Sequence, residues 1–226
     1  MTLTSIGTDA DFIERHGLWT EQQQQAAREM IAEADGRQLR NIRVSWADQH
    51  GIPRAKAVAL PALAGILRRG LTTNVGTLIA DSGGLIVSNP FTPGGGFDRE
   101  EMTGAPDVVA VPDPTTFRIL PWADSTGWVL CDLYFTPGEP VPYSSRQALH
   151  RAVEAASSMG LDLVTGIEIE WHLTRVETEG GERDLGDMGT PGSATATLPS
   201  SFGYQHQIEA ELDRLEGILA PIQDSL

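Results

Sequence analysis

Two glutamates separated by one residue, Glu168 and Glu170, are the residues whose types and spacing most clearly suggest chemistry. They lie in segment 166–173, where apolar and polar residues alternate, and this period of two predicts a half-buried β-strand. On such a strand both carboxylates point to the same face, roughly 6–7 Å apart. Two like charges held together attract a cation, and hard oxygen ligands favour Mg²⁺ or Mn²⁺ over zinc. The alternative interpretation is an ordinary sheet with a solvated face.

The composition limits the partners and the compartment. The 226 residues are 40% hydrophobic and 21% charged, as in soluble globular proteins. The net charge of −15 argues against nucleic acid or an anionic membrane as a partner. Cys131 is the only cysteine and lies in an apolar run, which predicts a packed thiol in a reducing compartment. Because no apolar run is long enough to span a bilayer, we expect a cytoplasmic protein.

The elements that must position the two glutamates are predicted from capping residues, from glycines and prolines, and from the spacing of apolar residues. Residues 1–37 predict a helical extension, with a short helix at 9–16 and a longer one that Thr20 and Gln23 begin as a capping box. Residues 38–136 predict a small β-grasp domain of α+β class, in which a hairpin with its turn at Asp48–Gly51 and then one helix precede further strands. Its expected strands are 39–47, 52–60, 85–88, 107–111, 115–120 and 127–135, and its expected helix, which Gly70 ends, follows Pro61.

The remaining residues, 137–226, predict a second folding unit. A proline-rich linker at 137–142 precedes a helix that Ser144 or Ser145 caps and Gly160 ends, and whose apolar residues, including Leu149 and Val153, fall on one face. Residues 178–203 are polar and predict a long loop, and apolar residues at helical spacing then predict a helix from 208 onward. That helix has no stop signal, so we expect the chain to be an N-terminal piece that ends inside its second domain.

Three stretches, in this order and at this spacing, resemble one enzyme family. They are Trp46-Ala47-Asp48-Gln49-His50-Gly51-Ile52-Pro53-Arg54-Ala55-Lys56, the run from Thr103 to Trp122, and Gly166-Ile167-Glu168-Ile169-Glu170. Together they resemble the N-terminal half of the glutamine synthetase family, most closely the branch that attaches glutamate to amines. The resemblance implies a small β-grasp N-terminal domain followed by the incomplete first part of a glutamine-synthetase-type catalytic α+β domain.

The resemblance also implies an ATP-dependent ligase. ATP, as a co-substrate, phosphorylates the side-chain carboxylate of glutamate, and ammonia or an organic amine then displaces phosphate from the acyl phosphate. Divalent cations neutralise the negative charges that this transfer brings together. In the family the two glutamates of the third stretch each ligate a different metal ion, so Glu168 and Glu170 are the implied ligands of Mg²⁺ or Mn²⁺.

Two further residues match the family near its amine site. Asp98, in Gly94-Gly95-Gly96-Phe97-Asp98, is similar to an aspartate that reaches a neighbouring subunit, binds ammonium and removes a proton. Arg99-Glu100-Glu101 replaces the small residues that usually follow, a departure that counts against plain ammonium and leaves room for a larger amine. The alternative is a plain flexible turn. Tyr204 matches a substrate-binding tyrosine of the ammonium pocket, or else is an ordinary tyrosine at a helix start.

The family's architecture implies partners beyond the substrates. Active sites form between subunits, so the resemblance implies a ring-shaped homo-oligomer. The later metal, glutamate and ATP ligands would lie downstream, so the chain alone is expected to be inactive. Two rival interpretations remain open: a non-catalytic structural or regulatory member of the family, and a carboxylate-rich metal-binding module unrelated to ligation.

Overall fold

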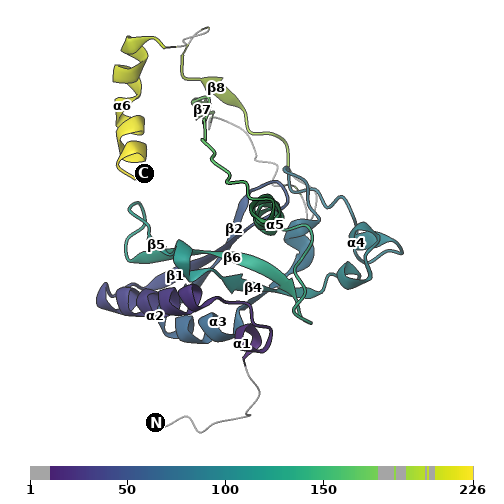
Figure 1. Ribbon diagram of the computed structural model, residues 1–226. Coiled ribbons are helices and arrows are strands. Elements are labelled where there is room, and N and C mark those ends of the chain that lie inside the picture. Colours follow the sequence, from purple (N-terminus) through teal and green to yellow (C-terminus); the bar gives the residue numbers. More distant parts are fainter. Residues whose placement is uncertain (1–10, 178–185, 187–191, 202, 204–206, 226) are drawn as a thin grey trace. The chain divides into compact units, whose positions relative to one another are not determined.

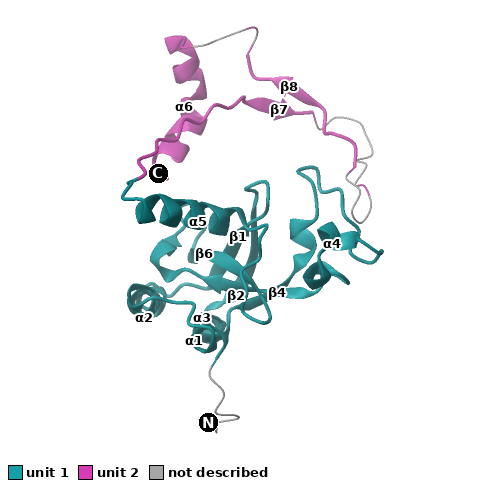
Figure 2. Cartoon of the chain, turned by 45° about the vertical axis from the view of Figure 1, so that its right-hand side comes forward, with its two compact units in different colours: residues 1–162 teal, residues 163–226 magenta. Residues whose placement is uncertain are grey.

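The computed structural model describes residues 11–177, 186, 192–201, 203 and 207–225, which include parts of two compact units (Figure 2). The units comprise residues 1–162 and 163–226. The expected domain boundary at 136/137 lies inside the first unit and stays a prediction. Within the described ranges, no helix is both long enough and apolar enough to cross a membrane.

A mixed sheet forms the centre of the first unit (Figure 1). Its strands are β1 (Asn41–Ala47), β2 (Pro53–Ala59), β3 (Leu71–Asn74), β4 (Asp107–Pro112), β5 (Arg118–Ile119) and β6 (Thr126–Phe135). The order is β2-β1-β6-β4-β3, and β5 also pairs with β6. Strands β1 and β6 run parallel, and the other pairs are antiparallel. A hairpin, a helix and a central parallel pair make the β-grasp arrangement, so the α+β prediction is confirmed.

The helices of this unit are α1 (Phe12–Arg15), α2 (Glu21–Gly36), α3 (Leu63–Arg69), α4 (Gly95–Asp98) and α5 (Ser145–Ser158), with 3₁₀ turns at Leu60–Ala62, Val75–Leu78, Glu100–Met102 and Pro114–Thr116. Three of them, α2, α3 and α5, begin and end largely where the sequence predicts, whereas α1 covers part of the expected 9–16, of which residues 9 and 10 lie outside the described ranges, and α4 was not predicted. The expected capping box is present: the Gln23 amide donates to Thr20 Oγ1 over 3.2 Å and the Thr20 amide to Gln23 Oε1 over 3.0 Å. Gly70 ends α3 with a φ of +71°, which glycine adopts readily.

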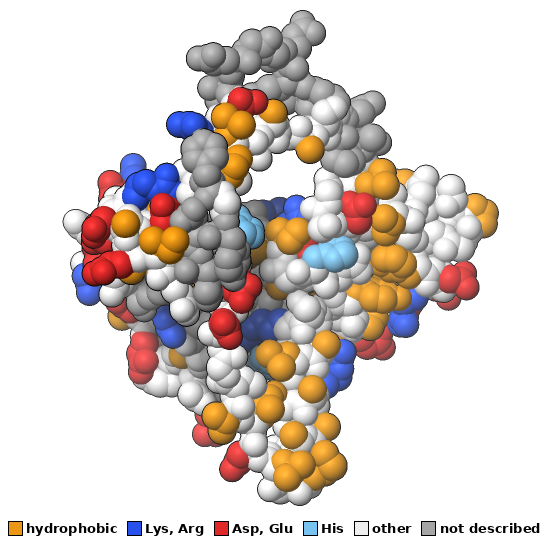
Figure 3. Space-filling view, turned by 90° about the horizontal axis from the view of Figure 1, so that it is seen from above, with side chains coloured by type: hydrophobic (Ala, Val, Ile, Leu, Met, Phe, Trp, Pro, Cys, Tyr) orange, Lys and Arg blue, Asp and Glu red, His pale blue; other side chains and the backbone are white. Residues whose placement is uncertain are grey.

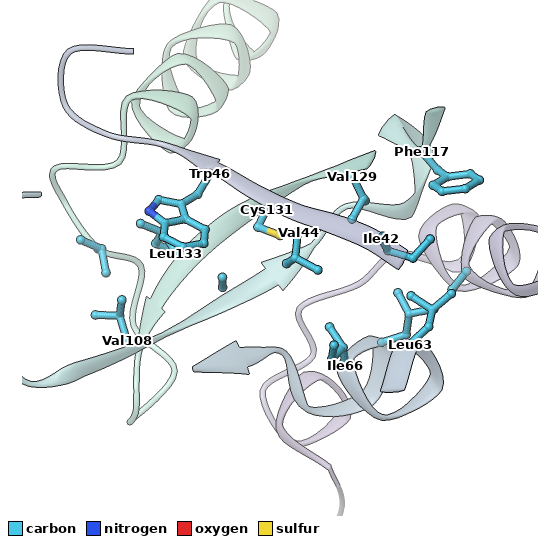
Figure 4. Packing of buried hydrophobic residues seen from close by; sticks show 14 of the residues in the cluster. Ile42, Val44, Trp46, Leu63, Ile66, Val108, Phe117, Val129, Cys131 and Leu133 are labelled. Carbon is cyan, nitrogen blue, oxygen red and sulfur yellow. The ribbon is translucent and has the colours of Figure 1, made fainter. Parts of the chain in front are cut away.

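One face of the sheet packs against α2 and α3 to form the core (Figure 4). Strand β6 alternates, and its residues Val129, Cys131, Leu133 and Phe135 are buried. They join Ile42, Val44 and Trp46 of β1, Met30 of α2, and Leu63, Ile66 and Leu67 of α3. Cys131 is 1% exposed, which confirms the expected packed thiol.

Three local predictions in this unit were wrong. Residues 85–88 form an isolated bridge, Ala80 with Ile86, in place of a strand, because they meet no neighbouring strand. Residues 115–120 contain part of a 3₁₀ turn and the two-residue β5, because the Asp113 side chain accepts a hydrogen bond from the Thr115 amide over 3.2 Å and so caps a turn there. The apolar face expected for α5 is largely exposed (Leu149 is 58% exposed), and the residue that α5 buries is Gln147.

The second unit contains a small hairpin and one helix among its described residues. Strand β7 (Thr174–Val176) pairs antiparallel with β8 (Thr197–Pro199), and α6 spans Glu209–Gln223. The predicted strand at 166–173 is not formed, and Ile167 and Ile169 are 89% and 76% exposed. A strand needs a partner ladder and a surface for its apolar face, and the described residues of the second unit bring neither to this segment. The same-face argument for the two glutamates therefore has no support in this structure.

Candidate functional site

Asp98 lies at the end of a tight left-handed turn. Gly94, Gly96, Phe97 and Asp98 have positive φ values of 74°, 66°, 60° and 56°. This region is open to glycine but disfavoured for a bulky side chain such as that of Phe97. Gly95 and Gly96 also lack room for a Cβ, which would lie 1.7 Å from the Asn89 carbonyl oxygen and 2.8 Å from Met102 Cβ, respectively. The glycine run is therefore required by the path of the backbone, and the turn has a definite shape.

Phe97 fixes this turn to the body of the first unit. Its amide donates to Ser88 Oγ over 2.9 Å, and its ring centroid lies 4.9 Å from that of Tyr143 at an interplanar angle of 49°. Both aromatic side chains also pack against the main hydrophobic core. The next residue, Asp98, is exposed, and its amide donates to the Gly94 carbonyl over 3.1 Å. The arrangement presents one carboxylate to solvent from an anchored turn, which suits a group that meets a substrate or a partner.

The charged residues after Asp98 pair with each other. Arg99 Nη2 lies 3.0 Å from Glu101 Oε1, and the pKa of Glu101 is lowered by a hydrogen bond from its own backbone amide and then by Arg99. In the part of the chain that the structure describes, no ion pair reaches Asp98. The carboxylate of Asp98 is thus available to a cation or a proton donor from outside the chain.

The expected metal ligands belong to the second unit. Glu168 and Glu170 are exposed and lie in the segment without a ladder. Their carboxylates are the hard donors that Mg²⁺ prefers, which fits the implied ion, but two such groups leave most of its coordination shell to water. Among described residues, no group of three or more His, Cys, Asp or Glu side chains could hold a metal ion. Tyr204, the expected substrate-binding residue, lies outside the described residues.

A buried ionic cluster on the other face of the sheet was missed by sequence analysis. Arg146 of α5 pairs with Asp132 of β6 over 2.7 Å and also with Asp113. Asp113 accepts further hydrogen bonds from Thr115 and from Gln23 of α2. These residues are far apart in sequence and their spacing has no regular pattern, so no sequence signal identifies them. The cluster ties α2 and α5 to the sheet, and we assign it a structural role.

A second buried carboxylate, Asp48, shapes the hairpin turn between β1 and β2. Its side chain accepts hydrogen bonds from the His50 and Ile52 amides and pairs with Arg54 over 2.9 Å. Burial by itself raises the pKa of Asp48, but the hydrogen bonds from Ile52, Arg54 and His50 outweigh it, and the pKa lies below its usual value. The stretch 46–56, on which the resemblance partly depends, is therefore a structural turn motif.

Comparison with known proteins finds no matching family model, but it finds similar individual proteins. The chain is 40% identical over 220 residues to gamma-glutamylanilide synthase of Acinetobacter sp., a match that covers 96% of this chain and 44% of that protein. It is 37% identical over 71 residues to glutamate–isopropylamine ligase of Pseudomonas sp., covering 31% and 16% of the two chains. It is also 37% identical over 98 residues to glutamine synthetase of Methanosarcina mazei, covering 42% and 21%.

Among solved structures, a GmaS/ADP complex matches with a TM-score of 0.45 and 25% identity, over 57% of this chain and 26% of that one. GmaS without ligand matches with a TM-score of 0.43 over the same shares. The chain thus spans about 44% of the length of gamma-glutamylanilide synthase.

Proposed function

Since this chain belongs to the glutamine synthetase family, we propose that it forms part of an ATP-dependent ligase joining the side-chain carboxylate of glutamate to an organic amine. The observation that carries the proposal is the 40% identity to gamma-glutamylanilide synthase across 96% of this chain. The matches to the isopropylamine ligase and to glutamine synthetase cover less of this chain, 31% and 42% respectively. We therefore propose an aromatic amine of the aniline type as the first acceptor to test.

The reaction that we propose has two steps. The glutamate carboxylate attacks the terminal phosphorus of ATP, which releases ADP and leaves an acyl phosphate. The amine nitrogen then attacks the acyl carbon, the carbon–oxygen bond to phosphate breaks, and the amine loses one proton. The products are the γ-glutamyl amide, ADP and phosphate. Bound divalent metal ions would supply charge neutralisation for the phosphoryl groups.

Asp98 is the residue that we assign to the amine step. It is exposed, it ends an anchored turn, and no described ion pair occupies it. An aromatic amine is mostly unprotonated at neutral pH, so a carboxylate there acts by accepting the proton that the attacking nitrogen loses. With ammonium the same carboxylate would also attract the cation, so Asp98 fits both acceptors.

Glu168 and Glu170 are the residues that we assign to the metal ions, and Tyr204 to the amine pocket. Carboxylates suit Mg²⁺ or Mn²⁺ by donor type, and further ligands must complete each coordination shell. We propose that those ligands, and the ATP and glutamate sites, come from residues beyond this chain. On this proposal the chain alone is inactive, and the complete protein works as a ring-shaped homo-oligomer in which Asp98 serves a neighbouring subunit. We place this reaction in the cytoplasm, on the basis of the single cysteine.

The test is phosphate release by the full-length protein in the presence of ATP, glutamate, Mg²⁺ and one amine at a time. The panel comprises aniline, isopropylamine and ammonia. We expect release that depends on aniline, and a loss of about 10²-fold or more in kcat/KM on Asp98→Asn. Asp35→Asn, the same substitution at an exposed aspartate of α2, is the matched control and should retain activity.

Other outcomes assign a different function. Release with ammonia alone would identify a glutamine synthetase, and release with isopropylamine alone an alkylamine ligase. A full-length protein that is silent with all three amines would favour a non-catalytic structural or regulatory role for this chain. Phosphate release by the 226-residue chain alone would contradict the proposal that it is an incomplete catalytic unit.

A further inference from the structure

The left-handed turn at Asp98 depends on contacts made by its neighbour Phe97. A bulky residue persists at a φ of +60° when the surrounding structure holds it there. The Phe97 amide is fixed by Ser88 Oγ over 2.9 Å, and the Phe97 ring lies against Tyr143. If the ring lost this contact, the backbone could relax toward a negative φ and turn the following carboxylate to another direction.

Tyr143 is itself held in place on both sides. Two residues before it, the Val141 amide donates to the Leu133 carbonyl of β6 over 2.9 Å, and Val141 is fully buried. Immediately after it, the Ser144 amide donates to the Val141 carbonyl over 3.1 Å. Ser145 Oγ then donates to the Asp48 carbonyl, also over 3.1 Å. The backbone on both sides of Tyr143 is therefore held to the central strand and to the β1–β2 turn, so the Tyr143 ring offers Phe97 a packing surface in a fixed position.

We propose that Tyr143 is a positioning residue for Asp98, acting through the ring of Phe97. This inference rests on the proposed function, in which the Asp98 carboxylate accepts the proton of the amine. The aromatic contact sets the backbone at Phe97, and the backbone sets the direction of the next side chain. Because the ring contact supplies the effect, the inference concerns the aromatic character of Tyr143 and does not involve its hydroxyl group.

The substitution that tests this is Tyr143→Leu, which keeps apolar bulk but removes the aromatic ring. Misplacement of a catalytic group by about 1 Å can cost on the order of 10²-fold in rate. We expect Tyr143→Leu to lower kcat/KM for the amine by about tenfold to 10²-fold in the full-length protein, with the KM for glutamate unchanged. Tyr143→Phe keeps the ring contact and should therefore leave kcat/KM for the amine within about twofold of that of the starting protein.

A double-mutant cycle separates positioning from a general loss of structure. If Tyr143 acts through Asp98, then Tyr143→Leu should cause no further loss in a protein that already carries Asp98→Asn. If Tyr143 merely supports the fold, the two losses should multiply. Circular dichroism and the melting temperature of each variant would show whether the protein remains folded. If Tyr143→Leu unfolds, Phe97→Leu takes its place in the cycle, because it removes the same contact between the two rings.

The outcomes distinguish this inference from the proposed function. Multiplying losses, or an unchanged kcat/KM for the amine in a folded Tyr143→Leu protein, would overturn the positioning role while leaving the function of Asp98 intact. An unchanged activity for Asp98→Asn would instead refute the proposed role of Asp98, and the positioning role with it. A loss that appears in the KM for glutamate to the same degree would also contradict a role confined to the amine step.

Discussion

Arg146 of α5 lies 2.7 Å from the carboxylate of Asp132 on β6, and both side chains are largely shielded from water. Arg146 also pairs with Asp113, so one guanidinium neutralises two carboxylates. Burial by itself lowers the pKa of Arg146, but the charge of Asp132 and the bonds to Asp113 outweigh it and raise the pKa, so the guanidinium stays charged. The folded state can therefore bury the carboxylates of Asp113 and Asp132 only because the guanidinium of Arg146 neutralises both.

Removing that cation should destabilise the first unit strongly. Arg146→Met leaves Asp113 and Asp132 without their shared partner, and breaking a buried ion pair from one side costs about 3–5 kcal/mol. The exposed Arg151 on the same helix is the control, and Arg151→Met should change the free energy of unfolding by less than about 0.5 kcal/mol. Urea denaturation followed by fluorescence measures both. Equal effects of the two substitutions would contradict a role for the buried cluster.

Asp113 should make stability depend on pH. Burial by itself raises the pKa of Asp113, but the hydrogen bonds from Thr115, Arg146 and Gln23 outweigh it, so the folded pKa lies below the usual value. A lowered pKa stabilises the folded state above the unfolded pKa of about 3.9, and this stabilisation is lost as the pH falls through the folded pKa. We expect the free energy of unfolding to fall less steeply below about pH 5 in Asp113→Asn than in the parent protein. The free energy of unfolding is measured by urea denaturation at several pH values below about pH 5. If it falls equally steeply with pH in Asp113→Asn and in the parent protein, the prediction is wrong.

Gly70 should tolerate a side chain much less well than Gly51. A Cβ at Gly70 would lie 2.4 Å from Val109 Cγ1 and 3.0 Å from the Ala110 carbonyl oxygen, whereas a Cβ at Gly51 meets nothing within 4 Å. Both residues have positive φ, which costs alanine about 1–2 kcal/mol, and the ψ of −175° at Gly70 lies in a region adopted essentially by glycine alone, where the cost is about 1–3 kcal/mol. At Gly70 the clash adds about 1–3 kcal/mol more. Thermal melts of the two alanine variants compare them directly, and the prediction fails if Gly51→Ala is the less stable one.

Cys131 should be unreactive in the folded protein. Burial first, and then the charge of Asp132, raise the pKa of its thiol well above the usual range, so almost no thiolate forms near neutral pH. We expect iodoacetamide to modify the chain in urea and to leave it unmodified under native conditions, as measured by intact mass. Rapid modification without urea would show that the core opens around β6.

The metal assignment predicts a specific loss in the full-length protein. Glu168→Gln and Glu170→Gln each remove one negative donor, so the Mg²⁺ concentration for half-maximal phosphate release should rise at least about tenfold. Glu177→Gln, an exposed glutamate of the same unit, is the control and should leave that concentration unchanged. An unchanged Mg²⁺ requirement in both test variants would remove Glu168 and Glu170 from the metal site.

Local signals predicted the elements that depend on nearby residues. The capping box at Thr20 and Gln23, the turn at Asp48–Gly51 and the stop at Gly70 were all visible because each involves contacts within a few residues. Strand β3 was missed, since four residues carry too little periodicity to identify. The strand expected at 166–173 was wrong for the opposite reason: its alternation is clear, but pairing depends on a distant partner.

The candidate site divides in the same way. Asp98 was identified by a short motif, and the structure describes it on a turn whose glycines the sequence also shows. The residues that fix this turn, Ser88 and Tyr143, lie nine residues before and 46 residues after Phe97, and no spacing rule connects them. Their contribution depends on tertiary packing, which a single sequence does not encode in any local pattern.

The parallel pairing of β1 with β6 has a consequence for folding of the protein during translation. Asn41 pairs with Thr126, a separation of 85 residues, and the register continues to Ser45 and Leu130. The hairpin partner of β1 emerges soon after it, but the other edge of β1 stays unpaired until β6 has been translated and has left the exit tunnel. Non-local pairing of this kind is slow, and an open strand edge invites association with other chains. Nascent chains halted before all of β6 (Thr126–Phe135) has left the tunnel should therefore bind chaperones more strongly than longer ones.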